Sequence, residues 1–356
     1  MMRFARSEDQ EMVAEAAREW LGRQPGARAL LEGQEPCPGG WDEVVAEQAW
    51  PALLAPEELG GLGFDLVALA AVHEEVGRAL VPLPLLGTSW AQAAILVNGD
   101  DAQRERWLTA IAEGAKGALL LDSGFTVAED GDGYVLTGTA LRVVDSVSAD
   151  LLVVHTAHGF FVIDGEDAGR QLCPALDPTR ELGHLSVNEL RVSADRRLAH
   201  ADVDTVRARC MALLAAECVG VAEAVMDLAV EYAKVREQFR RPIGSFQAIQ
   251  HICADMLVLV ESARSAALYA AWAVDTDHLD ALLAARTALA TAADAAFTCA
   301  GQSIQVHGGI GFTWEHAAHL YFKRARANRT LLGEPKAHRA AVAAHLFDSA
   351  PDNGGL

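Results

Sequence analysis

The sequence has no cysteine pattern that would support a metal site or a disulfide framework. Its 6 cysteines form neither a CxxC pair nor a Cys/His cluster with the spacing of metal ligands. Cys210, Cys218, Cys253 and Cys299 stand in alanine-rich segments, where they are expected to act as small buried side chains in a reducing compartment. A chain of 356 residues can bury a stable core without cross-links, and we predict no bound metal.

The chain also lacks the features of secreted and membrane proteins. The N-terminal segment MMRFARSEDQEMVAEAAREW is charged and amphipathic, whereas a signal peptide needs an apolar core. No uncharged apolar run reaches the roughly 20 residues that span a bilayer. The sequence therefore predicts a cytoplasmic protein without membrane insertion.

Positive charge is scarce. The chain has 29 Lys and Arg against 49 Asp and Glu, a net charge of −20, and no polybasic run offsets this excess. Such a chain repels nucleic acid and anionic membranes, so neither is predicted as a partner. A CoA ester or a flavin dinucleotide would need a local group of basic residues. The acidity alone is equally explained by solubility.

No GxGxxG motif follows a predicted strand, so a dinucleotide-binding βαβ unit is not expected. Instead, helical text is followed by strands and then by helices again, which predicts a mainly α protein with a middle β-domain. We divide the chain into an N-terminal helical domain (1–115), a middle β-domain (116–202), a C-terminal four-helix bundle (203–348) and a tail (349–356).

Local signals place the main elements. Ser7 precedes an acidic first turn and is a good helix N-cap. The middle stretch contains a hairpin with its turn at residues 130–133, and its short strands favour a small barrel or sandwich. Four long alanine-rich helices joined by short connections predict the bundle, over 206–235, 245–275, 280–305 and 315–328.

Two segments of the bundle could bind an anion. Arg236, Arg240 and Arg241 gather in a short turn before a helix that Ser245 could cap. Guanidinium groups beside a helix N-terminus suit a pyrophosphate, although a solvated turn has the same composition. Further on, Gln305–Phe312 reads QVHGGIGF, whose glycines let the backbone approach a ligand or simply another helix.

Together these segments resemble the acyl-CoA dehydrogenase family, in which the first is written close to RxQFGxxIxxFQ and the second close to QxxGGxGF. The similarity runs in order from about residue 5 to residue 345. It rests on the following stretches: PEELGGLG (56–63), EEVGRA (74–79), GYVLTG (133–138), LDPTR (176–180), REQFRRPIGSFQ (236–247) and QVHGGIGF (305–312).

The resemblance implies an acyl-CoA dehydrogenase-like fold and an oligomer that binds FAD between the middle domain of one subunit and the bundle of a neighbour. Arg236, Gln238 and Phe239 would contact the adenosine pyrophosphate end of FAD. Gln305, Gly308 and Gly309 would line the same dinucleotide. The implied reaction removes the α-proton of an acyl-CoA thioester by a carboxylate base, while hydride passes from the β-carbon to the flavin. Electron-transfer flavoprotein is the expected electron acceptor.

The sequence departs from the family at three places. The TEPxxGSD-like loop over the flavin is replaced by LDSGFTV (121–127). The aromatic-x-Ser/Thr run against the flavin ring is replaced by GTALRVV (138–144), which leaves hydroxyl donors to the flavin missing from that run. The glycine after Phe239 is Arg240, which would either add a phosphate contact or crowd the site.

The catalytic base is also missing from both positions that the family uses. One position counts to Leu332 and the other to Cys210, and neither side chain can take a proton from carbon. Glu217, two turns beyond Cys210 on an apolar helix face, is the best substitute, because burial would raise its pKa. A structural pairing of Glu217 with an arginine is the competing interpretation. Glu334 and Glu315 are weaker candidates, and Glu315 could instead cap a helix.

Two functions therefore follow from the resemblance. The chain is either a working acyl-CoA dehydrogenase subunit with an unusual base, in a homo-oligomer, or a non-catalytic partner subunit that completes the FAD site of a sister subunit in a hetero-oligomer. The second resembles the reduced subunits of bacterial dehydrogenases for steroid and other bulky acyl groups. A purely structural helical protein would explain the helices but not the Arg/Gln/Gly motifs.

Overall fold

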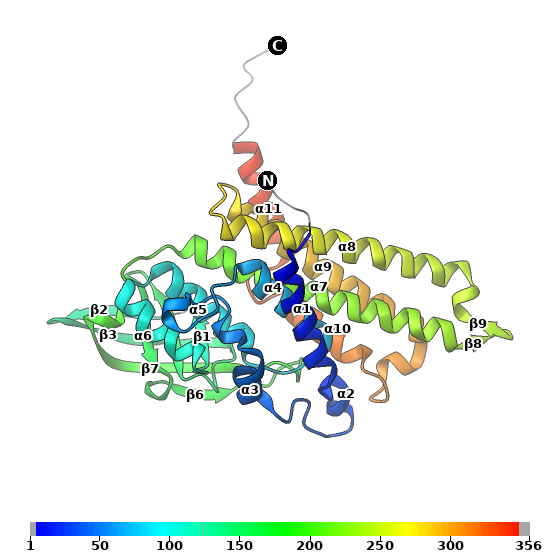
Figure 1. Ribbon diagram of the computed structural model, residues 1–356, viewed down its shortest axis with the longest axis horizontal. Helices are drawn as coiled ribbons and strands as arrows, with labels where there is room; N and C mark the ends of the chain where they lie inside the picture. The colour runs from blue at the N-terminus through cyan, green and yellow to red at the C-terminus, as the bar shows by residue number, and fades with distance from the viewer. Residues whose placement is uncertain (1–4, 123, 349–356) are drawn as a thin grey trace, which may run out of the picture.

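The computed structural model describes residues 5–122 and 124–348, so the predicted tail at 349–356 lies outside the described residues. The chain begins with a group of helices around α4 and α5 (Figure 1). Ser7 caps the first of them in a capping box with Gln10, as predicted. The helices of this group are α1 (Glu8–Gly22), α2 (Gly26–Leu31), α3 (Gly40–Glu43), α4 (Leu66–Ala79), α5 (Leu85–Asn98) and α6 (Asp101–Ala112), with short turns η1 (Val44–Gln48), η2 (Trp50–Ala52) and η3 (Glu57–Leu59).

The middle region folds into two small sheets that share one core. The first has the order β1-β4-β5, with β1 parallel to β4, and the second has the antiparallel order β2-β3-β7-β6. Buried side chains from both sheets form a single apolar cluster, which is a sandwich arrangement. The strands are β1 (Gly117–Leu120), β2 (Thr126–Asp130), β3 (Gly133–Val144), β4 (Leu151–Thr156), β5 (Gly159–Asp164), β6 (Gly169–Leu172) and β7 (Leu182–Ser193), with short turns η4 (Gly165–Asp167) and η5 (Ala194–Arg196).

The C-terminal region is a bundle of long helices, as predicted, and its fourth helix begins later than predicted. The last predicted helix begins at Ala318 rather than at Glu315, because a 3-10 turn and a bend occupy the preceding residues. A further helix follows it. The elements are α7 (Val203–Val235), β8 (Glu237–Gln238), β9 (Arg241–Pro242), η6 (Ile243–Ser245), α8 (Gln247–Asp275), α9 (Ala281–His307), η7 (Gly308–Phe312), α10 (Ala318–Asn328) and α11 (Pro335–Asp348).

Helix α7 joins the bundle to the N-terminal helices by close backbone contact with α4. A Cβ on Gly220 would lie 1.8 Å from the carbonyl oxygen of Glu74. A Cβ on Gly77 would lie 2.2 Å from the carbonyl oxygen of Glu217. Glycine is therefore required at both crossing points. The two groups of helices share one apolar core, and the crossing fixes Glu217 between α4 and the bundle.

Helix α8 is the one described helix that is long and apolar enough to cross a membrane by length and composition alone, and 39% of its apolar window is buried within the chain. Its buried face packs on α7 and α9, while Leu257 and Val258 stay 49% and 64% exposed. A bundle helix with one open apolar face meets the same criterion.

Candidate functional site

The basic segment at residues 236–241, which we call the basic hairpin, projects from the end of α7 (Figure 1). Strands β8 and β9 are joined by a two-residue turn in which Phe239 and Arg240 have φ values of 52° and 66°. Such a turn needs positive φ at both central residues. The backbone at Arg240 is left-handed, which explains why the family has glycine at this position. The exposed Arg240 side chain extends outward.

The side chains of the basic hairpin are largely open to solvent, although Phe239 makes an edge contact with the Phe246 ring and Arg241 lies over that ring. Arg236 and Gln238 are exposed, and the Phe239 ring is 87% exposed. The open ring lies beside the exposed arginines of the same hairpin, and together they suit a ligand or another chain. Helix α8 begins just after the hairpin without a side-chain cap. Ser245, predicted as that cap, instead donates to the Pro242 carbonyl oxygen at 2.7 Å.

The second segment at residues 305–312, which we call the glycine corner, lies where α9 ends. Gly308 has φ 64° and ψ −142°, a conformation that only glycine adopts readily. A Cβ on either Gly308 or Gly309 would meet no atom within 4 Å. The fold therefore gives no packing reason for glycine at Gly309. An approaching ligand or neighbouring chain would give one, and Gln305 is exposed beside it.

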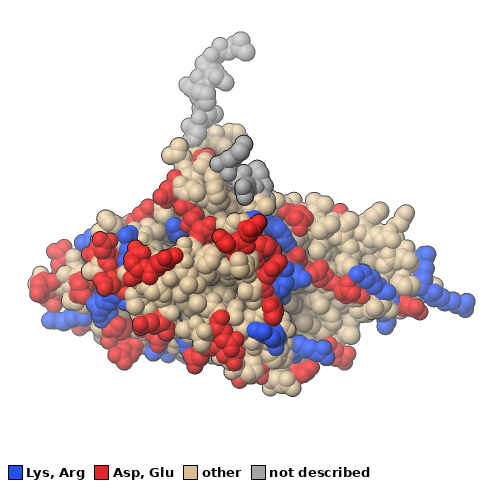
Figure 2. Space-filling view, in the orientation of Figure 1, with Lys and Arg blue, Asp and Glu red and all other residues tan. Residues whose placement is uncertain are grey.

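The two segments lie at the same end of the bundle (Figure 1). Tyr232, one turn before the basic hairpin, stacks on His307 at the start of the glycine corner, with ring centroids 4.5 Å apart. Lys and Arg side chains gather at the tip of this end, while the rest of the face is of mixed charge (Figure 2). Unpaired guanidinium groups and the free N–H groups of an uncapped helix suit a pyrophosphate. The residues present here therefore fit the dinucleotide end of FAD.

Two of the three departing segments meet one of the two lost base positions elsewhere in the fold. Segments 119–122, 140–144 and 331–332 line a cavity of about 110 Å³ with Trp90, which we call the centre cavity. Leu332, at one family position for the base, is buried in its wall. Cys210, at the other position, is fully buried, and burial raises the pKa of its thiol further.

The centre cavity does not offer a general base. Asp122 is the one carboxyl group among its described lining residues. Its two oxygens accept hydrogen bonds from Arg207 at 2.9 and 3.2 Å, and this pairing lowers the pKa of the carboxyl. A carboxylate held ionised by arginine is a weak proton acceptor. The described lining of the centre cavity therefore provides no base for removing the α-proton of an acyl thioester.

The structure contradicts the expected pKa of Glu217. The side chain is buried as expected, but one of its oxygens accepts hydrogen bonds from Arg180, from Arg324 at 3.0 Å and from Asn328 at 2.9 Å. Burial alone would raise the pKa of this carboxyl, and the two guanidinium groups outweigh burial and lower it. The competing interpretation, a structural Glu–Arg pair, matches this geometry. Glu315 and Glu334 are both exposed.

A buried network around Glu217 was not visible in the sequence. Arg324 donates from Nε to Asp177 at 2.5 Å and from Nη2 to the Thr179 carbonyl oxygen at 2.6 Å. The LDPTR stretch at 176–180 is thereby tied to α7 and α10. The LDPTR stretch was the one sequence signal for this network, because its Asp and Arg need partners. The sequence does not identify those partners.

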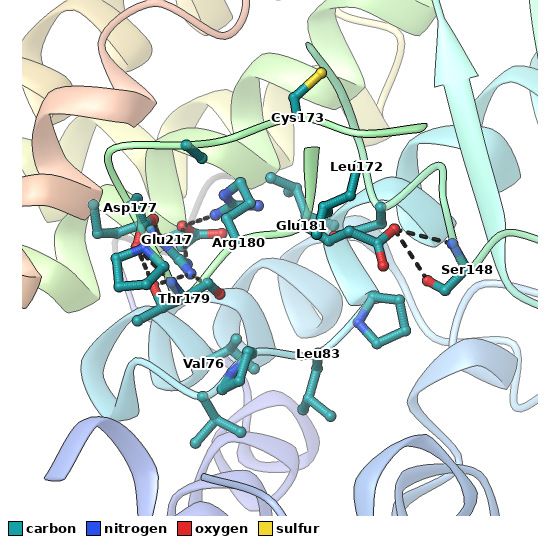
Figure 3. A pocket seen from close by; sticks show the side chains of 18 of the residues that line it. Val76, Leu83, Ser148, Leu172, Cys173, Asp177, Thr179, Arg180, Glu181 and Glu217 are labelled. Atoms are coloured by element: carbon teal, nitrogen blue, oxygen red, sulfur yellow. Dashed lines mark hydrogen bonds and ion pairs between the residues drawn. The ribbon is translucent and has the colours of Figure 1, made fainter. Parts of the chain in front are cut away.

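A larger cavity of about 480 Å³ lies where the loop at 172–181 faces the end of α4 and the start of α5. Figure 3 shows Val76 and Leu83 across this space from Thr179 and Arg180. Asp145 lies in its wall, buried, and accepts a hydrogen bond from the Gly87 N–H at 2.8 Å. Burial raises the pKa of Asp145 to about 7. We call this space the Asp145 cavity.

Replacing Asp145 with asparagine should stabilise the protein at alkaline pH. The folded-state pKa is raised from 3.8 to about 7, so the folded chain binds the proton more tightly than the unfolded chain. The wild type therefore loses stability as pH rises through this window. Asparagine keeps an acceptor for Gly87 and removes the charge. We expect a gain of about 4 kcal/mol in unfolding free energy at pH 8 relative to pH 4.

Urea unfolding of both proteins between pH 4 and pH 8 measures this difference. The exposed turn residue Asp132 provides the control, since Asp132→Asn should change stability by less than about 0.5 kcal/mol. A difference between Asp145→Asn and wild type that does not vary with pH would show that Asp145 is ionised throughout.

The structure is a helical–β–helical chain with an exposed basic hairpin and a glycine corner at one end of its bundle. Comparisons with known proteins agree with this class. Residues 7–115 match the family model for the acyl-CoA dehydrogenase N-terminal domain, and residues 196–347 match the model for the C-terminal domain. The chain belongs to the acyl-CoA dehydrogenase family, whose members are FAD-dependent oxidoreductases that act on acyl-CoA and form oligomers.

Individual relatives cover nearly the whole chain. It is 37% identical to the acyl-CoA dehydrogenase IpdE2 of Mycobacterium tuberculosis, over 96% of this chain and 98% of the relative. It is 28% identical to the mitochondrial short-chain specific acyl-CoA dehydrogenase of Mus musculus, over 96% and 91%. Among solved structures, a chain of the ChsE4–ChsE5 complex from Mycobacterium tuberculosis superposes with a TM-score of 0.89 at 27% identity, covering 98% of this chain and all of that chain.

Proposed function

We propose that this chain is the non-catalytic partner subunit of a hetero-oligomeric acyl-CoA dehydrogenase. The observation that carries the proposal is the contrast between its two sites. The basic hairpin and the glycine corner keep an open, unneutralised surface for a dinucleotide. The centre cavity, in contrast, has leucine at one base position and holds its only described lining carboxylate on Arg207. The basic hairpin and the glycine corner can still bind a dinucleotide. The centre cavity lacks the carboxylate base that α-proton abstraction requires.

In this arrangement the chain contributes binding rather than chemistry. Arg236 would neutralise the pyrophosphate of FAD, and Phe239 and Gln238 would cover its adenosine end. Gln305, Gly308 and Gly309 line the same dinucleotide from the glycine corner. FAD supplies the redox step when bound, and the sister subunit supplies the carboxylate base and the donors to the thioester oxygen.

The comparisons support a mixed assembly. One similar structure is a complex of two differently named chains, ChsE4 and ChsE5. A second, at 26% identity and a TM-score of 0.87, is described as the Tcur3481–Tcur3483 steroid dehydrogenase. A third, at 25% identity, comes from work on an electron-transferring flavoprotein. For the assembly that contains this chain, we propose a bulky acyl-CoA substrate at the sister subunit's reaction centre and an electron-transferring flavoprotein as electron acceptor. We also propose a cytoplasmic location.

Flavin content tests the proposal. The chain purified alone should carry almost no FAD. Co-expression with a sister dehydrogenase from the same host that retains the TEPxxGSD-like loop should give a yellow complex that bleaches anaerobically with acyl-CoA. A homo-oligomer of this chain that is yellow and bleaches on its own would overturn the partner-subunit proposal and restore the working-enzyme alternative.

A further inference from the structure

The Asp145 cavity plays no part in the proposed function, yet it has the size and lining of a ligand site. Its volume of about 480 Å³ lies within the range of about 300 to 1,000 Å³ typical of small-molecule pockets. One wall is apolar and includes Val76, Leu83 and Leu86. The opposite wall, on the loop at 172–181, is mixed and carries the polar side chains of Thr179, Arg180 and Glu181 (Figure 3). An apolar wall that faces a few converging polar groups is the usual arrangement of a binding pocket.

Two polar side chains of this cavity keep a buried nitrogen without any hydrogen-bond partner. They are Arg180, at Nε, and His73, at Nδ1. Arg180 is 8% exposed and His73 is 0% exposed. An unsatisfied buried donor costs about 1 to 3 kcal/mol. A small rotation of the guanidinium toward an oxygen atom in the cavity would satisfy Arg180 while its Nη2 atom keeps Glu217.

The Asp145 cavity is separate from the centre cavity. Leu86 and Trp90 lie one turn apart on α5, and they face the Asp145 cavity and the centre cavity respectively. Between them, the Gly87 N–H donates to Asp145, and a Cβ on Gly87 would lie 2.9 Å from the Val144 carbonyl oxygen. Helix α5 and the end of β3 therefore pack without a gap. A molecule in the Asp145 cavity is screened from the place where the family reaction occurs.

The charge of the cavity selects against anions. Four carboxyl groups line it against two guanidinium groups, namely Asp145, Asp177, Glu181 and Glu217 against Arg180 and Arg324. Arg324 already uses its donors on Asp177, Glu217 and Thr179. A bound carboxylate or phosphate would therefore add like charge to a buried negative excess. A neutral oxygen acceptor would meet no such penalty.

We propose that the Asp145 cavity binds a neutral, mainly apolar molecule that carries a carbonyl or hydroxyl oxygen, at a site separate from the dehydrogenation centre. The apolar wall on α4 and α5 takes the hydrocarbon part, and Arg180 donates to the oxygen. This ligand site would give the subunit a binding function of its own, independent of whether it carries FAD.

Calorimetric titration of the full chain with two ligands built on one hydrocarbon cage tests this inference. The probes are 2-adamantanone, a neutral ketone, and adamantane-1-carboxylate, its charged counterpart. At pH 8 the ketone should bind at least about tenfold more tightly than the carboxylate, because the like charge of the wall costs the anion more than about 1.4 kcal/mol. Equal affinity for the two probes, or no binding of the ketone up to its solubility, would overturn the proposal.

Two variants locate the binding. Leu83→Trp fills the apolar wall and should weaken ketone binding at least about tenfold, whereas Leu62→Trp, at a position that is 43% exposed, should leave it unchanged. Asp145→Asn removes one negative charge and should improve binding of the carboxylate while the ketone keeps its affinity. If Leu83→Trp does not fold, Asp145→Asn still decides, since an unchanged preference between the probes in that variant contradicts binding at this cavity.

Discussion

Replacing Glu217 with glutamine is expected to lower the free energy of unfolding by about 3 to 5 kcal/mol, the cost typical of breaking a buried ion pair. The substitution keeps the shape of the side chain but removes the negative charge that neutralises Arg180 and Arg324. Both guanidinium groups are buried and would lose their common counter-charge. Urea unfolding at pH 7, followed by circular dichroism, measures the effect.

The pH dependence gives a second measure of the same pair. The folded-state pKa of Glu217 is lowered, so its stabilising contribution is complete above its ordinary pKa of 4.5. It is lost as pH falls below that value toward the folded-state pKa. The glutamine variant should therefore show a smaller loss of stability in acid than the wild type.

Glu231 provides a matched control on the same helix, because its side chain is 69% exposed in its pair with Lys234. Glu231→Gln should change stability by less than about 0.5 kcal/mol. If Glu217→Gln instead unfolded like the wild type, while a complex containing it lost α-proton exchange, Glu217 would be a catalytic base after all.

Replacing Arg236 with alanine is expected to weaken FAD retention by the sister complex about 10- to 100-fold. Hydrogen bonds from a charged donor to a phosphate contribute about 1.5 to 3 kcal/mol each. The Arg236 side chain has no partner within the described residues and is exposed, so its removal should not alter the melting temperature of the chain. Flavin absorbance per complex after gel filtration, together with FAD titration of the apo-complex, provides the measurement.

Arg28→Ala serves as the control, since Arg28 is 84% exposed and its ion pair among the described residues is with Glu32 on the same helix turn. This variant should retain FAD as the wild type does. The loss caused by Arg236→Ala should also grow as salt is lowered, because screening weakens the contact. Full flavin occupancy in Arg236→Ala would remove the basic hairpin from the FAD site.

Much of the fold could be predicted because it rests on local signals. Ser7 and Gln10 form their capping box from residues three apart in the sequence. The turn between β2 and β3 follows from adjacent glycine and aspartate residues. The fourth bundle helix was placed three residues too early, because the glycine corner continues as a 3-10 turn that leaves no periodic signal.

The residues of the candidate site could likewise be predicted only where they are neighbours in the sequence. The basic hairpin and the glycine corner are each continuous in sequence, so their residues could be named beforehand. The partners of Glu217 could not, because Arg180 and Arg324 lie 37 and 107 positions away. The direction of a pKa shift depends on which charges lie nearest. The sequence alone predicted that Glu217 is buried but not which charges surround it.

The sequence by itself determined the family, the order of helices and strands, and the two segments suited to a dinucleotide, because each depends on residues that are neighbours along the chain. Tertiary structure alone decided which carboxylate is neutralised, that two altered segments share the centre cavity with Leu332, and that a larger cavity beside Asp145 is closed off from it. Burial, Coulomb attraction and the close approach at Gly87 act through space between distant segments, and their balance exists only once the chain has folded.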